Sequence, residues 1–205
     1  MNDSIIWNYL KNHGFNDYAT AGIMGNLRKE SELSPTKLEI CFSKSLNKTD
    51  EQYTREVDQN IYKDFVTDKA GYGLAQWTYW TRKQGLLDYA KQRKVSIGDL
   101  NMQLDYLYQE IIEYKEMVSK LEKVKDVRSA SSIFMLDFEK PVDQSKAEQN
   151  RRANFALEYY NKFATGNTGN TGNSGSNTTV LTSHSNNSLF DYSEEAFLKF
   201  WNKIF

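Results

Sequence analysis

Apolar residues recur at helical spacing through most of the first 163 residues. The clearest series has intervals of four, three, four and seven residues, which places its members on one face of a helix. A capping box at residues 96–99 precedes this series. The pattern therefore predicts a central core helix over residues 100–118. Its apolar residues are Leu100, Leu104, Leu107, Ile111 and Val118.

Shorter series of the same kind predict five more helices in this part of the chain. Asp17 is the expected N-cap of one of them, and Ser34-Pro35 is its expected stop, because proline disfavours helix in the residue before it. We therefore expect the first 164 residues to form one mainly α domain with a small extended element. The predicted helices cover residues 2–13, 17–33, 80–90, 126–138 and 145–163.

The extended element is expected at Gly71–Thr78. Two glycines bracket Tyr72, and the residues after them alternate between the two sides of a strand, which predicts a small β-hairpin. Residues 36–69, just before it, are polar and weakly periodic, apart from a turn or two of helix after a capping pattern at Thr49. We interpret this long segment as a flap over a cleft.

Glu30 is the candidate for chemistry that the helical pattern itself singles out. Ala19, Ile23, Asn26 and Glu30 are spaced by four, three and four residues and so share the inward face of their helix. Glu32 lies about 200° further round and should face water. Partial desolvation and the negative end of the helix dipole should both raise the pKa of an inward carboxylate here. A general acid that works at neutral pH needs a raised pKa.

Composition excludes several other classes of function. Cys41 is the only cysteine, and His13 and His184 are isolated, so we expect neither a disulfide nor a metal site, and no cofactor. A net charge of −1 gives no reason to expect nucleic acid as a partner. No apolar run is long enough to insert in a membrane, and the first 15 residues lack a signal peptide.

The composition changes at Thr165. Residues 165–188 repeat Gly, Asn, Thr and Ser without charge, which is typical of a flexible linker. Residues 189–205 are rich in aromatics and predict a short amphipathic helix, which cannot bury its own apolar stripe. We expect this helix to dock on the main domain, to mediate self-association or binding of a partner, or to begin a further module.

Three groups of motifs, taken in order, resemble the phage tail lysozyme family, and the resemblance covers residues 5–163. It implies an α+β lysozyme-like fold and a peptidoglycan hydrolase without a cofactor, with Glu30 matching the family's catalytic glutamate and residues 73–76 lining the cleft. Such enzymes act at the bacterial cell wall, from phage tails, endolysins or conjugative elements. The motifs are Ala21–Leu27 with Glu30-Ser31 and Pro35, then Gly71–Thr78 with Arg82-Lys83, then Gln103-Leu104 with Phe138-Glu139-Lys140-Pro141.

The implied chemistry is cleavage between N-acetylmuramic acid and N-acetylglucosamine, with Glu30 as general acid. Asp68 is the expected second carboxylate, because its place before Gly71 resembles that of an auxiliary aspartate in goose-type lysozymes; Asp58 and Asp64 are weaker candidates. Without a second carboxylate the substrate would complete the reaction itself, as in lytic transglycosylases, and leave a 1,6-anhydro sugar.

Substrate contacts are expected from the residues around the glycine turn. Tyr72 and Trp77 offer flat faces for sugar rings, Gln76 can hydrogen-bond an acetamido group, and Gly73 belongs to the cleft lining. Trp80 offers a similar face, although core packing explains it as well. A different class also stays open, namely a wall-binding or phage tail structural protein without activity.

Overall fold

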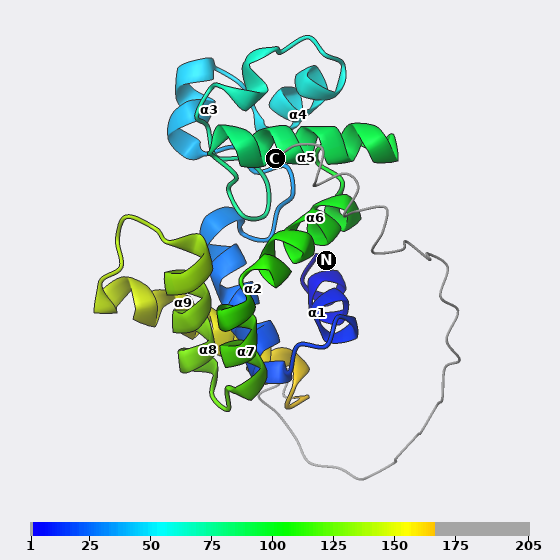
Figure 1. The fold of residues 1–205 in the computed structure, drawn as a ribbon. Helices are drawn as coiled ribbons and strands as arrows, with labels where there is room; N and C mark the ends of the chain where they lie inside the picture. Colours follow the sequence, from blue (N-terminus) through cyan, green and yellow to red (C-terminus); the bar gives the residue numbers. More distant parts are fainter. Residues whose placement is uncertain (1, 167–205) are drawn as a thin grey trace, which may run out of the picture. The chain divides into compact units, whose positions relative to one another are not determined.

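The computed structural model describes residues 2–166, which form helices joined mostly by short loops (Figure 1). All of them fall within one unit, residues 1–170. This confirms the mainly helical fold expected from the sequence. The elements are α1 (Asn2–Asn12), α2 (Asp17–Ser31), α3 (Ile40–Leu46), α4 (Asp50–Asp58), a 3-10 turn η1 (Asp64–Val66), α5 (Trp80–Arg93), α6 (Leu100–Glu113), α7 (Lys115–Lys123), α8 (Val127–Phe134), a π-helical turn η2 (Met135–Glu139) and α9 (Lys146–Phe163).

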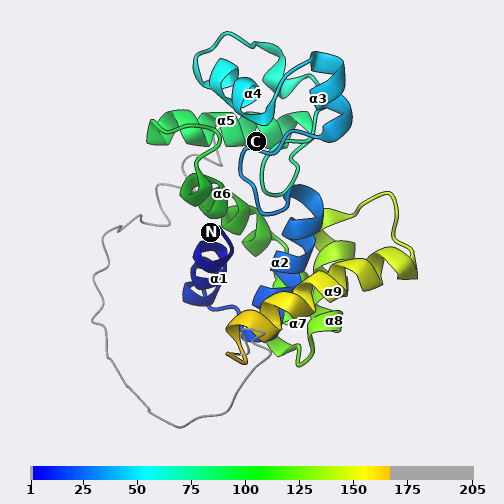
Figure 2. The ribbon, with the colours of Figure 1, turned by 180° about the vertical axis from the view of Figure 1, so that it is seen from behind.

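Helix α2 is the buried centre of this fold. It packs most extensively against α9 and α8, which lie beside it in both views (Figures 1 and 2). Two glycines permit this approach: a Cβ at Gly22 would lie 2.7 Å from Ala130 of α8, and one at Gly25 would lie 2.6 Å from the backbone of α9. The backbones of α2 and α9 are thus in direct contact near the residues of interest, Asn26 and Glu30.

The helices α3, α4 and α5 gather at the other end of the described unit, away from α7, α8 and α9 (Figures 1 and 2). Aromatic residues form the core there, with ring centroids of Tyr53, Phe65 and Tyr72 between 5.5 and 6.1 Å apart. Helix α6 contacts α1, α5 and α7, so it connects the two groups of helices.

Several of the expected helix starts are confirmed by their capping hydrogen bonds, although α6 is capped by Asp99 and not by Ser96, the first residue of the predicted capping box. The side chains of Thr49, Asp99, Asp126 and Ser145 each accept a bond from the backbone N–H three residues later. Helix α2 is an exception, since its cap is Asn16, which accepts from the N–H of Ala19 at 2.9 Å. The assignment of the cap to Asp17 was therefore one residue too late.

The prediction of one continuous helix over residues 100–118 is wrong, because two helices cover these residues. Tyr114, with ψ of 63°, leaves the helical region and ends α6, and α7 begins directly after it. The ring of Tyr114 packs edge-on against Phe138, 5.4 Å away. The apolar spacing runs across the break because both helices face one core, so periodicity alone could not reveal it.

The β-hairpin expected at residues 71–78 does not form. Within residues 2–166 this region contains only isolated bridges, from Tyr72 to Leu38 and from Tyr72 to Trp77. The ladder does not extend outward because the backbone groups of Ala70, the next position, are used elsewhere: its N–H donates to Asp68 Oδ1 at 2.9 Å and its carbonyl accepts from Lys83 Nζ at 2.7 Å. Gly73, with φ of 75°, makes the turn, and a Cβ there would meet Gln103 at 2.7 Å.

Residues 36–69 are more ordered than a polar flap. They contain α3, α4 and η1, and they supply Tyr53 and Phe65 to the core. The turn of helix expected after Thr49 is confirmed as α4. None of the helices in the described part combines the length and the apolarity needed to cross a membrane. The linker expected at 165–188 extends beyond the described residues, and the helix expected at 189–205 lies wholly outside them.

Candidate active site

Glu30 lies in the last turn of α2 and is partly open to solvent. Its side chain is 20% exposed, whereas Ala19, Ile23 and Asn26 on the same helix face are fully buried. Glu32 is exposed, which confirms the predicted division between the two glutamates. A carboxylate at the edge of the core in this way can meet a ligand from solvent while the helix holds its backbone.

The turn after α2 has an unusual backbone. Glu32 and Leu33 have φ angles of 56° and 62°, in the left-handed region that residues other than glycine seldom adopt. Asn2 of α1 donates its side-chain N–H to the carbonyl of Leu33 at 2.9 Å, and Ser31 donates its hydroxyl to the carbonyl of Leu74 at 2.9 Å. These bonds tie the end of α2 to α1 and to the glycine turn.

Arg152 of α9 fixes the Glu30 side chain. Its Nη2 lies 2.6 Å from Glu30 Oε1, its Nε donates to Glu148 Oε1 at 2.9 Å, and its Nη1 donates to Asn26 Oδ1 at 3.1 Å. The guanidinium is 3% exposed, so these contacts operate away from bulk water. One arginine therefore joins α2 to α9 and sets the direction of the candidate acid.

Glu139, at the end of the π-helical turn η2, is a second carboxyl group in this region. Its Oε1 is buried and has no hydrogen-bond partner among residues 2–166. Burial, followed by the negative charge of Glu30, raises the pKa of Glu139 to about 8, while Arg82 and Arg152 act in the opposite direction. In the sequence Glu139 belongs to the motif at residues 138–141, which indicates no role for this residue.

Arg82 and Glu110 form an ion pair whose charges act on Glu139. The guanidinium of Arg82 grips both oxygens of Glu110, with distances of 2.7 and 2.8 Å. The indole N–H of Trp77 donates to Glu110 Oε2 at 2.7 Å, and its ring is fully buried. Trp77 thus holds Glu110 in place and has no ring face open to a sugar.

The sequence matches the phage tail lysozyme family over residues 1–163, which is most of the chain. The chain belongs to the phage tail lysozyme family. It is also 27% identical over 175 residues to a protein called morphogenesis protein 1 from Bacillus phage B103. That alignment covers 81% of this chain and 40% of the relative, so the chain spans less than half of the relative's length.

Asp68 in this phage tail lysozyme domain is enclosed by its own partners. Lys83 Nζ lies 2.5 Å from it, the hydroxyls of Tyr53 and Tyr62 donate to it at 2.6 and 3.1 Å, and the N–H of Ala70 donates at 2.9 Å. The side chains of Asp68 and Lys83 are 5% and 0% exposed. These contacts are typical of a structural ion pair and leave little access for a substrate.

The weaker acidic candidates lie in other surroundings. Asp58 accepts from the hydroxyl of Ser96 at 2.6 Å and from the N–H of Ile97 at 2.9 Å, so it organises a turn. Asp64 is an exposed residue in the first turn of η1. Among residues 2–166 no group of three or more potential ligand residues is arranged to hold a metal ion.

The predicted substrate-binding residues are buried or half-buried. Tyr72 is fully buried, with its hydroxyl 2.6 Å from that of Thr54, so its ring cannot stack on a sugar in this conformation. Gln76 is half-buried and donates to the carbonyls of Lys37 and Gly73 at 3.0 and 3.1 Å. Gln76 and Gly73 therefore shape the turn of the phage tail lysozyme domain from within.

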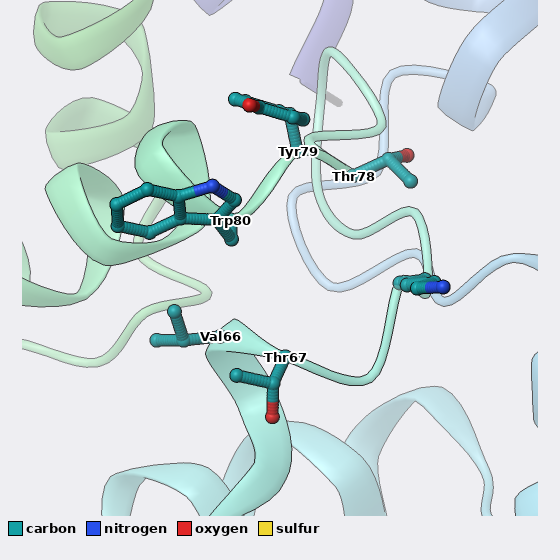
Figure 3. A pocket seen from close by; sticks show the side chains of 6 residues that line it. Val66, Thr67, Thr78, Tyr79 and Trp80 are labelled. Atoms are coloured by element: carbon teal, nitrogen blue, oxygen red, sulfur yellow. The ribbon is translucent and has the colours of Figure 1, made fainter.

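The exposed aromatic rings lie just after the glycine turn, and of the two only that of Trp80 was considered from the sequence. Tyr79 and Trp80 are 63% and 55% exposed, so the core-packing alternative for Trp80 is wrong. They border an open pocket of about 500 Å³ whose lining is mainly apolar (Figure 3). Arg82 follows Trp80 by two residues, about 200° round α5, so it lies on another face of this helix, and neither Arg82 nor Glu30 lines the pocket. The other lining residues are Val66, Thr67, Lys69 and Thr78.

Proposed function

We propose that this domain is a peptidoglycan hydrolase that cleaves the glycosidic bond between N-acetylmuramic acid and N-acetylglucosamine, with Glu30 as general acid. Membership of the phage tail lysozyme family supports a role on the bacterial cell wall. The observation that carries the residue assignment is the position of Glu30. It is partly open to solvent, it stands at the end of a rigid helix, and a buried arginine holds it.

In the proposed reaction, protonated Glu30 gives its proton to the glycosidic oxygen as the bond to the sugar breaks. The electron pair of that bond leaves with the oxygen, and positive charge develops on the sugar ring. Water completes hydrolysis and returns a proton to the site. In the transglycosylase alternative, the 6-hydroxyl of the muramic acid attacks in place of water.

The surroundings of Asp68 favour a structural role for this residue, although the sequence suggested it as the second carboxylate. A nucleophile or a base needs a free lone pair that faces the substrate. The oxygens of Asp68 accept from Lys83, two tyrosine hydroxyls and a backbone N–H. We therefore leave Asp68 out of the chemical step.

The pocket beside Tyr79 and Trp80 is the proposed binding surface for sugar rings. Pockets of several hundred Å³ with aromatic walls and a few polar groups are typical of small-molecule sites. Lys69 supplies a cation at the edge of this pocket. It suits the carboxylates that muramic acid and the peptide stems carry.

Digestion of purified peptidoglycan, followed by mass spectrometry of the products, tests the proposal. Glu30→Gln keeps the size of the side chain and removes the acid, so we expect activity to fall by at least about 100-fold. Glu32→Gln is the matched control, because Glu32 is exposed two residues along the same segment, and it should retain activity.

The products decide between the reaction types. Reducing N-acetylmuramic acid ends indicate a muramidase, and anhydro ends indicate a transglycosylase. Reducing N-acetylglucosamine ends would contradict the proposed bond. Absence of products from the wild type would refute the enzymatic function, and full activity of Glu30→Gln would refute Glu30 as the acid.

A further inference from the structure

Glu148 of α9 is a single carboxylate that faces three cationic side chains. Arg152 Nε lies 2.9 Å from its Oε1, and Lys29 Nζ lies 3.8 Å from the same oxygen. Arg151 Nη1 lies 3.4 Å from the other oxygen, Oε2. The side chain of Glu148 is 7% exposed, so it holds the three cations from the edge of the core. Its single negative charge cannot balance all of them.

The candidate acid belongs to the same group of charges. Arg152 Nη2 lies 2.6 Å from Glu30 Oε1, so one guanidinium joins Glu30 to Glu148. Lys29 directly precedes Glu30 in the last turn of α2, and Arg151 directly precedes Arg152 in α9. A continuous chain of contacts therefore joins Lys29 and Arg151 to the candidate acid. Three cations face two carboxylates in this group, so one positive charge is left over.

Lys29 and Arg151 are the cations of this group that face solvent. Their side chains are 33% and 60% exposed, whereas that of Arg152 is 3% exposed. Within residues 2–166 neither of the two donates a hydrogen bond, and both contacts to Glu148 are longer than the usual N–H···O distance. Exposed contacts of this kind contribute little to stability. Their N–H donors are therefore available to a ligand that brings acceptor oxygens and a negative charge.

A carboxylate is the group of the proposed substrate that fits this surface. The sugar rings of the glycan are neutral, and the peptide stems carry negative charge as carboxylates. Each stem is attached to muramic acid, the sugar on one side of the bond that we propose to be cleaved. Arginine binds a carboxylate through charge-assisted N–H donors, often two in parallel, and lysine supplies a second cation. A stem carboxylate held here would lie beside the candidate acid.

We propose that Lys29 and Arg151 bind a carboxylate of the peptide stem, so that the domain selects glycan strands that carry charged peptides. The proposal rests on the proposed function and names the part of the substrate that is bound next to Glu30. Glu148 and Arg152 keep the two cations in place, because they hold them together from below. The contact is ionic, and the proton still comes from Glu30.

Calorimetric titration of the full chain with soluble wall fragments tests the proposal without turnover. Fragments that consist of N-acetylglucosamine, N-acetylmuramic acid and the peptide, in that order, lack the bond that we propose to be cleaved. They are compared with free carboxylates and after conversion of these carboxylates to amides. The wild type should bind the free form about tenfold more tightly, because charge-assisted hydrogen bonds are lost in the amide.

The double variant Lys29→Gln/Arg151→Gln should bind both forms equally, with the affinity that the wild type has for the amide. It should melt like the wild type, since both side chains lie at the surface; if it does not, each single variant should still lose part of the preference. Lys11→Gln/Arg128→Gln is the matched control. It removes one lysine that is 34% exposed and one exposed arginine from α1 and α8, and it should keep the tenfold preference.

Equal binding of the two forms by the wild type would overturn the proposal, and so would a failure of both forms to bind. A preference that persists in Lys29→Gln/Arg151→Gln would also overturn it. Loss of that preference in Lys69→Gln would then assign the carboxylate to the pocket beside Trp80. A preference that depends on Lys29 and Arg151, in a protein that digests no peptidoglycan, would support the binding site and refute only the enzymatic function.

Discussion

Asp68→Asn should destabilise the domain strongly, because it leaves the Lys83 ammonium in the core without its counter-ion. The side chain of Lys83 is 0% exposed, and its remaining partners are the carbonyl of Ala70 at 2.7 Å and the hydroxyl of Tyr53 at 3.3 Å. Breaking a buried ion pair in this way costs about 3–5 kcal/mol. For a domain of this size that corresponds to a fall in Tm of roughly 6–20 °C.

The loss should depend on pH in a defined direction. Burial lowers the pKa of Lys83 below its ordinary value of 10.5, and Asp68 opposes that effect. Without Asp68, the pKa of Lys83 falls further, so the folded state binds fewer protons than the unfolded state over a wider range below 10.5. Stability then rises with pH in that range. The deficit of Asp68→Asn should therefore be full near pH 6 and narrow as the pH approaches 10.5.

Thermal and urea unfolding at several pH values measure the effect. The double variant Asp68→Asn/Lys83→Met is the control, because it removes the unpaired charge and should be more stable than Asp68→Asn alone. A cost below about 1 kcal/mol for Asp68→Asn would refute the reasoning. If the variant were as stable as the wild type and could not digest peptidoglycan, Asp68 would be the second catalytic carboxylate that its place in the sequence suggested.

Three further substitutions test the helix contact, the arginine and the pocket. Gly25→Ala should cost about 1–3 kcal/mol in urea unfolding, because its Cβ would lie 2.6 Å from the backbone of α9; a gain in stability, as alanine gives in an open helix, would contradict that contact. Arg152→Lys should lower both Tm and activity, since an ammonium cannot reproduce the fork that bridges Asn26, Glu30 and Glu148; unchanged values would show that the bridge is dispensable. Trp80→Ala should raise KM by about tenfold with little change in kcat, as expected when uniform binding is lost; unchanged kinetics on soluble wall fragments would exclude the pocket as a sugar site.

Local patterns predicted the inward face of α2 and most of the helix starts. The spacing of Ala19, Ile23 and Asn26 was enough to place Glu30 on the inward face, because a helix fixes the direction of each side chain. The capping residues were also readable, since a cap and its N–H donor are only three residues apart.

The partners of Glu30 were not readable in the same way. Asn26 and Arg152 are 126 positions apart, and no local pattern indicates that α9 crosses α2 at that point. Glu139 was visible only as part of the Phe-Glu-Lys-Pro motif. Residue type also failed to separate the buried ring of Trp77 from the exposed ring of Trp80, because the difference depends on which side of a turn faces the core.

The position of Glu30 depends on the strained left-handed turn that follows α2. Glu32 and Leu33 each hold a conformation that costs on the order of 1–3 kcal/mol. The bond from Asn2 to the carbonyl of Leu33 helps to hold that strained turn closed. Helix α1 therefore stabilises the turn that follows α2. If it is loosened, the turn can relax, and the last turn of α2 can unwind and carry Glu30 away from Arg152, although no residue around the carboxyl group has changed.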